Sequence, residues 1–349
     1  FGATSGITTS TTQETGIFDI SFMIDTQPYG TYNITSISGT THVSATDKFK
    51  VLPQIIKVTP TQVYVGDEVI VEGSGYVEVG TIKLDFGKTE EITSIYIESK
   101  AKGLFEAKFI VDTQPQGTTI ITAYASEASA LIIRDTDKVV IKGEIISVRP
   151  TEGYVGDKIT IKGAGYSSQQ EVKVGFGKTE EITTITSTYA GTFTCVFRID
   201  TQPAGTTVIT ADDTYTKDTD SLIIKGRIIS VSPTQAYVGG EVTVIGAGYN
   251  YKATVDISFG KTEKITQVES TGFGTYLAKF IIDTQPAGTT TIRAKDTSQE
   301  DTDELRIIGQ IIKVTPTEAT VGELITVEGV GFDAKDSVQI GFGKAQDLT

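Results

Sequence analysis

A stretch of 22 residues occurs four times in this chain with small changes, each time ending at an aromatic residue. The copies are Ile55–Tyr76, Ile145–Tyr166, Ile228–Tyr249 and Ile311–Phe332. Each copy reads as an apolar strand, a Pro-Thr turn, a turn around Val-Gly and a second strand with alternating apolar residues, which a Gly-x-Gly segment then breaks. A chain organised in this way must be an array of similar small β domains.

A second motif, Asp-Thr-Gln-Pro, lies between these copies and sets the period of the array. Its prolines are 87, 88 and 83 residues apart in the copies Asp25–Pro28, Asp112–Pro115, Asp200–Pro203 and Asp283–Pro286. Asp112, Asp200 and Asp283 are expected to hydrogen-bond the loop backbone that follows them. We divide the chain into a C-terminal half-repeat, three complete repeats and an N-terminal half-repeat, at 1–53, 54–143, 144–226, 227–309 and 310–349. Very short connections between repeats predict a semi-rigid rod.

The strand pattern predicts an all-β fold. In the third repeat we expect seven strands, at 228–231, 241–246, 254–259, 264–269, 275–282, 290–295 and 304–308. A spacing of roughly ten residues with turn residues between the strands indicates a sandwich of two sheets. Aromatic residues that recur beside the glycine turns are expected in the core, and a sugar-stacking ladder is the alternative; they are Phe86, Tyr166, Phe176, Tyr249, Phe259 and Phe332.

These motifs together carry a resemblance to a known family. The order Ile-x-x-Val-x-Pro, Val-Gly, Glu-Val-Thr-Val-x-Gly-x-Gly-Tyr, Ile-x-Phe-Gly260 and Pro286-Ala-Gly288 resembles the immunoglobulin-like fold shared by plexins and transcription factors, the IPT/TIG family. The resemblance covers nearly the entire chain. It implies tandem early-set immunoglobulin-like sandwiches, which serve in prokaryotic surface proteins, receptor ectodomains, DNA-binding factors and glycan-processing enzymes. The resemblance therefore leaves the function open.

Composition restricts the possible partners. The net charge of −14, from 44 acidic and 30 basic residues, opposes binding to nucleic acid. No run approaches the roughly 18 apolar residues of a membrane span. Cys195, the only cysteine, lies between Phe193 and Phe197 on an alternating strand and is expected to be a buried thiol. We expect no enzymatic activity, because His42 is the only histidine and the Gly-x-Gly segments are not followed by a helix.

Two acidic loops offer ligands for a metal ion, in the second repeat and in the third. Their carboxylates belong to Asp212, Asp213, Asp218, Asp220, Asp296, Asp301 and Asp303. Oxygen ligands gathered near a domain junction predict a Ca²⁺ site, and a solvated acidic loop is the alternative. Asn33 begins the tripeptide Asn-Ile-Thr, which is an N-glycosylation sequon if the chain is secreted.

The array favours a structural role outside the cell. We expect a subunit of an extracellular filament, stalk or surface lattice, located at the cell surface. The two end segments are complementary halves, because together they cover one repeat and an overlap in which Phe342–Thr349 aligns with Phe1–Thr8. We therefore expect a head-to-tail homopolymer with composite sandwiches, or else a longer repeat chain. The alternative is an adhesin or a glycan-binding rod whose partners are surface glycans.

Overall fold

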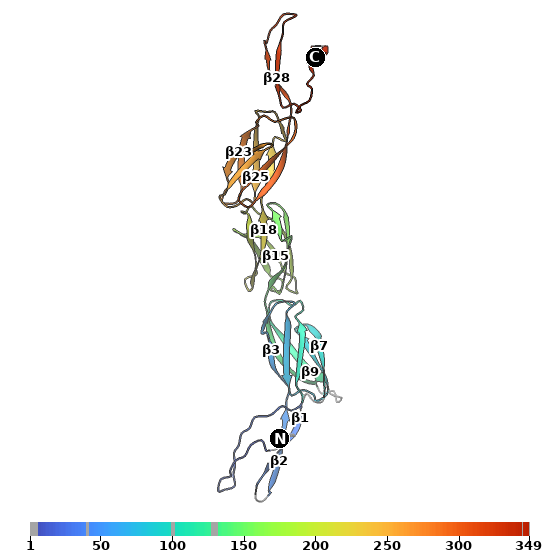
Figure 1. Cartoon of the computed structure of the whole chain (residues 1–349). Coiled ribbons are helices and arrows are strands. Elements are labelled where there is room, and N and C mark those ends of the chain that lie inside the picture. The colour runs from blue at the N-terminus through green and yellow to red at the C-terminus, as the bar shows by residue number, and fades with distance from the viewer. Residues whose placement is uncertain (1–5, 40–41, 99–101, 127–131, 344, 349) are drawn as a thin grey trace.

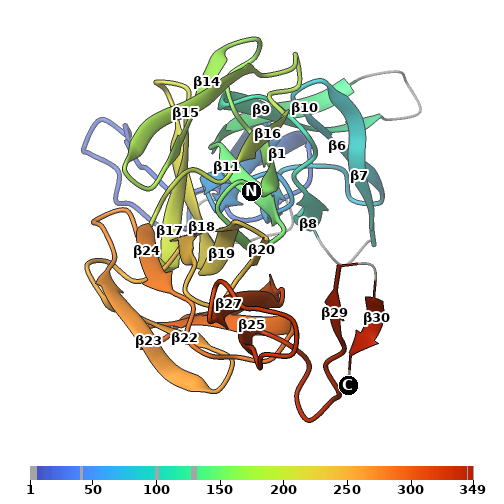
Figure 2. The ribbon, with the colours of Figure 1, turned by 90° about the horizontal axis from the view of Figure 1, so that it is seen from above.

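The chain forms an elongated rod of β-sandwiches in the computed structural model, which describes residues 6–39, 42–98, 102–126, 132–343 and 345–348 (Figure 1). These residues make three complete sandwiches in succession and an incomplete one at each end. Viewed along the rod, successive sandwiches are rotated around its long axis (Figure 2). The predicted all-β, immunoglobulin-like tandem fold is confirmed. No helix in the described part of the chain is long and apolar enough to cross a membrane.

Each complete sandwich contains eight strands within the described residues. In the first repeat they are β3 (Gln54–Thr59), β4 (Gln62–Val63), β5 (Glu68–Ser74), β6 (Gly80–Phe86), β7 (Thr89–Ile97), β8 (Phe105–Ile110), β9 (Gly117–Ser126) and β10 (Ile132–Ile141). In the second they are β11 (Glu144–Arg149), β12 (Glu152–Tyr154), β13 (Lys158–Ala164), β14 (Glu171–Phe176), β15 (Thr179–Thr186), β16 (Phe193–Arg198), β17 (Gly205–Asp212) and β18 (Lys217–Lys225). In the third they are β19 (Arg227–Ser232), β20 (Gln235–Ala236), β21 (Glu241–Ala247), β22 (Thr254–Phe259), β23 (Thr262–Glu269), β24 (Tyr276–Ile281), β25 (Gly288–Lys295) and β26 (Glu300–Ile307).

Every complete repeat has the same two sheets. In the third repeat, β19, β21 and β24 form a three-stranded antiparallel sheet, and the second sheet has the order β20-β26-β25-β22-β23. The short strand β20 pairs with β26 in parallel. In β19 the register shifts between Ile228 and Ser230, which marks a β-bulge, and the first strands of the other repeats show the same shift.

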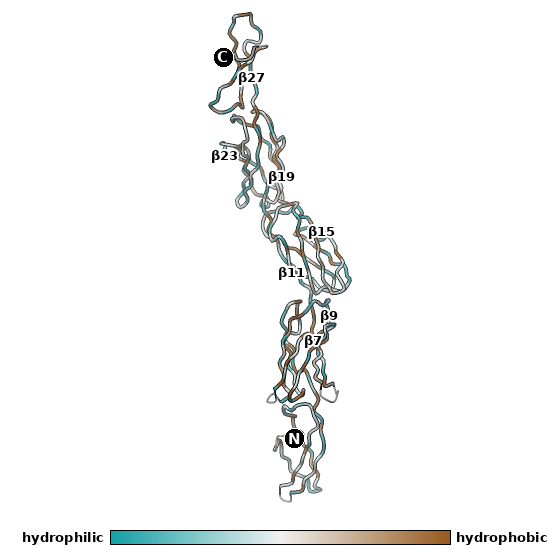
Figure 3. Tube along the Cα trace, turned by 90° about the vertical axis from the view of Figure 1, so that its right-hand side faces the viewer, coloured by the Kyte–Doolittle hydropathy of each residue, from teal (hydrophilic) through white to brown (hydrophobic). Residues whose placement is uncertain are grey.

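The core of each sandwich lies between the sheets and follows from the alternation of apolar and polar residues (Figure 3). In β24, Tyr276, Ala278 and Phe280 point inward and the intervening residues are exposed. Tyr249 is fully buried, with its ring centroid 4.9 Å from that of Tyr276 in a T-shaped arrangement. The recurrent aromatic residues of the complete repeats are therefore core residues, as expected. Cys195 is also buried, and burial raises the pKa of its thiol.

The two end segments are half-sandwiches whose inner faces are open. The first contains the hairpin of β1 (Gly30–Ile37) and β2 (Ser44–Val51), and the last contains β27 (Gln310–Thr315), β28 (Thr326–Val330), β29 (Ile340–Phe342) and β30 (Ala345–Leu348). Residues 17–24 align with β24 but form no strand, because the half-sandwich has no equivalent of its partner β21. Phe332, the counterpart of Tyr249, is 38% exposed because the last half-sandwich has no equivalent of β24, whose Tyr276 packs against Tyr249. Residues 1–5, 344 and 349 of the predicted overlap lie outside the described residues.

The strand expectations for the third repeat require two corrections. All seven expected strands are present, but β20 is an additional strand that the Pro-Thr turn concealed. The last strand begins at Glu300 and not at residue 304, so Asp301 and Asp303 lie in β26 and not in a loop. Asp218 and Asp220 similarly lie in β18. Cross-strand pairing with β25 and β17 thus overrides the turn preference of these aspartates.

Candidate functional site: the junctions between repeats

The Asp-Thr-Gln-Pro motif links each sandwich to the next one. The residue after its proline donates a backbone N–H to the carbonyl oxygen of the aromatic residue that ends the following 22-residue stretch. The donor–acceptor distances are 2.8 Å for Tyr29 to Tyr76, 3.0 Å for Gln116 to Tyr166, 2.9 Å for Ala204 to Tyr249 and 3.0 Å for Ala287 to Phe332. The two repeated motifs of the sequence therefore meet across every junction between described repeats, including those with the half-sandwiches.

Within its own repeat, the aspartate of this motif has a role that sequence reasoning predicted only in part. Asp283 accepts a hydrogen bond from the hydroxyl of Thr262, and the corresponding pairs are Thr179 to Asp200 and Thr89 to Asp112. In all three repeats the aspartate therefore binds the threonine that follows Phe-Gly-Lys. At Asp200 the carboxylate also accepts the backbone N–H of Thr201, the residue that follows it. This tie anchors the motif to the sandwich that carries it.

The Gly-x-Gly segment brings the backbones of neighbouring repeats into contact. Gly248 has a φ of +75°, and a Cβ atom there would lie 2.3 Å from the carbonyl oxygen of Lys225 in the preceding repeat. Gly165 has a φ of +71°, and its Cβ would lie 2.4 Å from the oxygen of Lys142. Only glycine satisfies both the left-handed backbone and this approach. The repeated glycines are therefore junction residues.

Four of the aspartates predicted as calcium ligands accept backbone hydrogen bonds within their own repeats. Asp218 and Asp301 each accept the N–H of the bulged residue that begins the repeat, Ile145 and Ile228, both at 2.7 Å. Asp213 accepts the N–H groups of Ser167, Tyr215 and Thr216, and Asp296 accepts those of Asn250, Ser298 and Gln299. These carboxylates satisfy N–H groups that would otherwise lack a partner.

The remaining candidates lie apart from these four. Asp212 contacts Lys217 at 3.5 Å, while Asp220 and Asp303 accept the N–H of the residue that follows each of them. Within the described ranges, no three His, Cys, Asp or Glu side chains are grouped so that they could hold a metal ion. Calcium binding therefore stays a prediction without a cluster of ligands. Asn33 is exposed on β1, and its glycosylation also stays a prediction.

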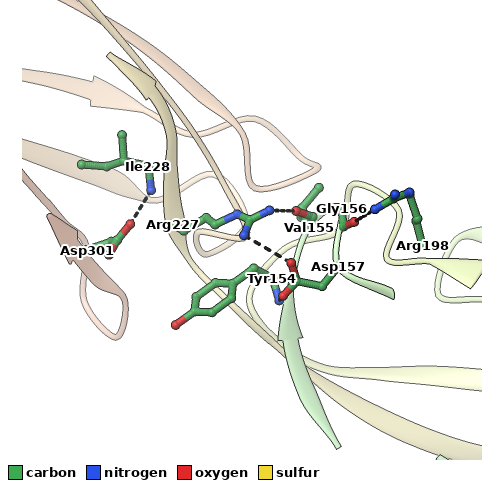
Figure 4. A network of polar contacts seen from close by, with 8 residues as sticks. All are labelled: Tyr154, Val155, Gly156, Asp157, Arg198, Arg227, Ile228 and Asp301. Atoms are coloured by element: carbon green, nitrogen blue, oxygen red, sulfur yellow. Dashed lines mark hydrogen bonds and ion pairs between the residues drawn. The ribbon is translucent and has the colours of Figure 1, made fainter. Parts of the chain in front are cut away.

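The junction between the second and third repeats has an additional clamp at Arg227 (Figure 4). Its guanidinium donates to the carbonyl oxygen of Val155 at 2.6 Å and lies 3.3 Å from the carboxylate of Asp157. It also lies over the ring of Tyr154, 5.4 Å from the centroid. All three partners belong to the Tyr-Val-Gly turn of the preceding repeat, so this side chain joins two sandwiches.

Lys178 makes a second side-chain contact across that junction. Its ammonium group lies 5.1 Å from the ring centroid of Phe273 and 5.4 Å from that of Tyr251, and it donates to the carbonyl oxygen of Gly272 at 3.2 Å. A lysine of the second repeat is thus held by two aromatic rings of the third. Sequence reasoning missed both cations. Arg227 stands at a position where the repeats differ, whereas Lys178 belongs to the recurring Phe-Gly-Lys motif.

Glu144 replaces Arg227 at the junction between the first and second repeats. Partial burial raises the pKa of its carboxyl group, and the nearby carboxylates of Asp67 and Asp218 raise it further. A carboxylate cannot donate a hydrogen bond as Arg227 does. In the last junction this position is Gln310, whose amide donates to the carbonyl oxygen of Val238 at 3.1 Å. The same place therefore holds a hydrogen-bond donor at Arg227 and Gln310 and an acid at Glu144.

No protein-family model and no curated protein sequence matches the chain. Among solved structures, a tetra-tandem repeat from the extending region of a large adhesion protein aligns with 80% of this chain and 81% of its own length, at 11% identity and a TM-score of 0.25. The ICAM-5 D1-D4 ectodomain fragment aligns over 79% and 82%, at 12% identity and 0.21. SGBP-B of the Bacteroides ovatus mixed-linkage glucan utilization locus, in complex with a heptasaccharide, aligns over 75% and 72%, at 12% identity and 0.24. At such TM-scores the likeness carries no argument about function, and membership of the IPT/TIG family stays an expectation.

Proposed function

We propose that the chain is the structural rod of an extracellular or cell-surface protein. The observation that carries this proposal is the N–H to carbonyl bond between the Asp-Thr-Gln-Pro segment and the next repeat, which recurs at 2.8–3.0 Å from Tyr29 to Phe332. A flexible string of domains would not need the same contact at each connection. Repetition of one junction fixes direction along the array, so the repeats supply length and stiffness.

We further propose that the rods join end to end through their half-sandwiches. Phe18 is 48% exposed whereas its counterpart Phe105 is 7% exposed, and Val314 is 40% exposed whereas Val231 is 8% exposed. The first half corresponds to β23–β26 and the last to β19–β22 with the start of β23, so outside this overlap each half offers the strands that the other lacks. A second copy that completes the sandwich would bury both apolar faces, and this contact does not close on itself.

Sedimentation velocity of the 349-residue chain over a range of concentrations tests end-to-end joining. We expect oligomers that lengthen with concentration and appear as rods by electron microscopy. Val327→Asp places a charge in the open inner face and should leave monomers, whereas Glu328→Gln, on the opposite face of β28, should assemble normally. A parent chain that stays monomeric at high concentration would exclude self-completion.

An adhesin is the second candidate, and one surface favours it. On the outer face of the third repeat Ile245 pairs with Leu277, and the two side chains are 37% and 55% exposed. The first repeat has Glu72 paired with Glu106 at these positions. An apolar pair that replaces two acids suits a contact with a ligand. Glycan-array binding that Leu277→Glu abolishes would support this role, and an array without signal would count against glycans as ligands.

A further inference from the structure

A cavity lies beside the junction between the first half-sandwich and the first complete repeat. Its volume is about 360 Å³, and its walls include Ile24, Asp25, Gln54, Ser74 and Gly75. Residues on both sides of a junction thus line one space.

In each complete repeat, the Tyr-Val-Gly turn is bound to the residue that precedes Asp-Thr-Gln-Pro. The turn glycine donates its N–H to the carbonyl of that residue, at 2.8 Å for Gly66 to Val111, 2.9 Å for Gly156 to Ile199 and 2.9 Å for Gly239 to Ile282. The same residue donates its own N–H back to the position after the glycine, at 2.8, 2.8 and 2.9 Å to Asp67, Asp157 and Gly240. This reciprocal pair of bonds is therefore a constant part of a finished sandwich.

Ile24 is the equivalent residue in the first half-sandwich, and it lines the cavity. Within the described residues, no hydrogen bond is made to its backbone N–H or C=O. The half-sandwich therefore has the residue that binds a Tyr-Val-Gly turn in each complete repeat, and a turn of the same sequence position is present in the last half-sandwich.

The turn at Thr320–Glu323 in the last half-sandwich already has the required shape. Its Gly322 has a φ of +98°, close to the +97° of Gly66. The N–H of Thr320 donates to the Glu323 carboxylate at 2.7 Å, as that of Tyr64 donates to Asp67 at 2.8 Å. Val321 at its tip is fully exposed. A turn that is ordered before binding loses little conformational entropy when it docks.

We propose that this cavity binds the Thr320–Glu323 turn of a second copy of the chain. Gly322 donates its N–H to the carbonyl of Ile24, and Ile24 donates its N–H to the carbonyl of Glu323. The amide of Gln54 donates to the carbonyl of Val321, as Gln310 donates to Val238 at 3.1 Å and Arg227 to Val155 at 2.6 Å. The inference rests on the proposed end-to-end joining and names the contact that sets its register.

Cysteine cross-linking between differently labelled chains tests this contact. One chain carries Gln54→Cys, the other carries Val321→Cys, and a short bismaleimide is added after mixing. Buried Cys195 is present in both. A single chain with Arg227→Cys and Val155→Cys is the positive control for the geometry. Gln54→Cys mixed with Lys335→Cys is the negative control, because the strand β28 lies between Lys335 and the turn in the same half-sandwich. We expect a covalent dimer from the first mixture and none from the last.

The outcomes distinguish an error in this cavity contact from a failure of end-to-end joining. If oligomers form and the positive control reacts while the Gln54 and Val321 mixture does not, the cavity assignment is wrong and end-to-end joining stands. If no oligomers form, both proposals are overturned. In addition, Gln54→Ala should raise the concentration needed for half-assembly about fivefold through loss of one hydrogen bond, and Gln54→Arg should restore it. An unchanged concentration for Gln54→Ala would remove this side chain from the contact.

Discussion

The junction between the second and third repeats is held by side chains that the junction between the first and second lacks. At the former, Arg227 binds the Tyr-Val-Gly turn and Lys178 is held by two aromatic rings. At the latter, Glu144 takes the place of Arg227, and no ion pair between described residues crosses from one repeat to the other. One junction therefore joins opposite charges, and the other places like charges together.

Both junctions nevertheless share their backbone contacts. The N–H groups of Gln116 and Ala204 reach the next repeat at 3.0 and 2.9 Å, and Gly165 and Gly248 approach the preceding backbone in the same way. We infer that these shared contacts set the orientation of neighbouring sandwiches, whereas the variable side chains set the resistance to bending. An array can then keep its direction while a single residue adjusts the stiffness of each connection.

The largest expected effect comes from the shared glycine. Gly248→Ala should destabilise the third repeat by at least about 2 kcal/mol, because a Cβ would meet the Lys225 carbonyl at 2.3 Å and the backbone is left-handed. Gly165→Ala should cost a similar amount in the second repeat. Chemical unfolding of each variant measures the loss of free energy of unfolding.

Gly239→Ala is the matched control for this pair. Its φ is +85°, but no atom outside its chain neighbours lies within 4 Å of the added Cβ. Only the backbone term of about 1 kcal/mol should remain. If Gly239→Ala costs as much as Gly248→Ala, the close approach between repeats contributes nothing and the junctions do not share this contact.

The sequence predicted the fold well because the fold depends on local periodicity. The alternation in Tyr276–Ile281 is sufficient to place the inner face of a strand, and four copies of one stretch establish the repeat. The predicted start of β26 was wrong because aspartates such as Asp301 and Asp303 are typical of turns. Their extended conformation is imposed by pairing with Ala294 and Ile292, and Asp301 is further held by the N–H of Ile228.

The junction chemistry was harder to predict from the sequence. Arg227 donates to the carbonyl oxygen of Val155, which lies 72 positions earlier in another repeat. The spacing of motifs along the sequence does not show which backbone acceptor of a neighbouring repeat a side chain will reach. One signal was nevertheless available. The residue immediately before each repeated stretch changes from Gln54 to Glu144, Arg227 and Gln310, while the stretch itself hardly changes.

Reversal of the charge at Arg227 or at Glu144 should give the second largest effect. Arg227→Glu should weaken the contact between the second and third repeats by about 1 kcal/mol of interaction free energy. This value is modest because the side chains of Arg227 and Asp157 are 34% and 37% exposed. Glu144→Arg should stiffen the preceding junction by a similar amount. Electron micrographs of single rods give the distribution of angles at each junction.

The exposed pair between Lys279 and Glu241 supplies the control, since it lies within one repeat at 2.9 Å. Lys279→Glu should leave both angle distributions unchanged. If Arg227→Glu bends the rod no more than this control, the clamp has no mechanical role and the two junctions are equivalent.

The smallest effect should be a pH dependence confined to the junction at Glu144. The pKa of this carboxyl group is raised in the folded chain by burial and by Asp67 and Asp218, so the protonated form is favoured there. Its stabilising contribution is complete below the ordinary pKa of glutamic acid and is lost as pH rises through the higher folded value. When protonated, Glu144 can donate to the carbonyl of Val65 as Gln310 does to Val238.

The distribution of angles at this junction should therefore narrow on acidification from neutral pH toward pH 4.5, while the distribution at the Arg227 junction should not follow that titration. Glu144→Gln supplies a permanent donor and should give the narrow distribution at every pH. A parent chain and a Glu144→Gln variant with the same pH response would show that another group controls the bending.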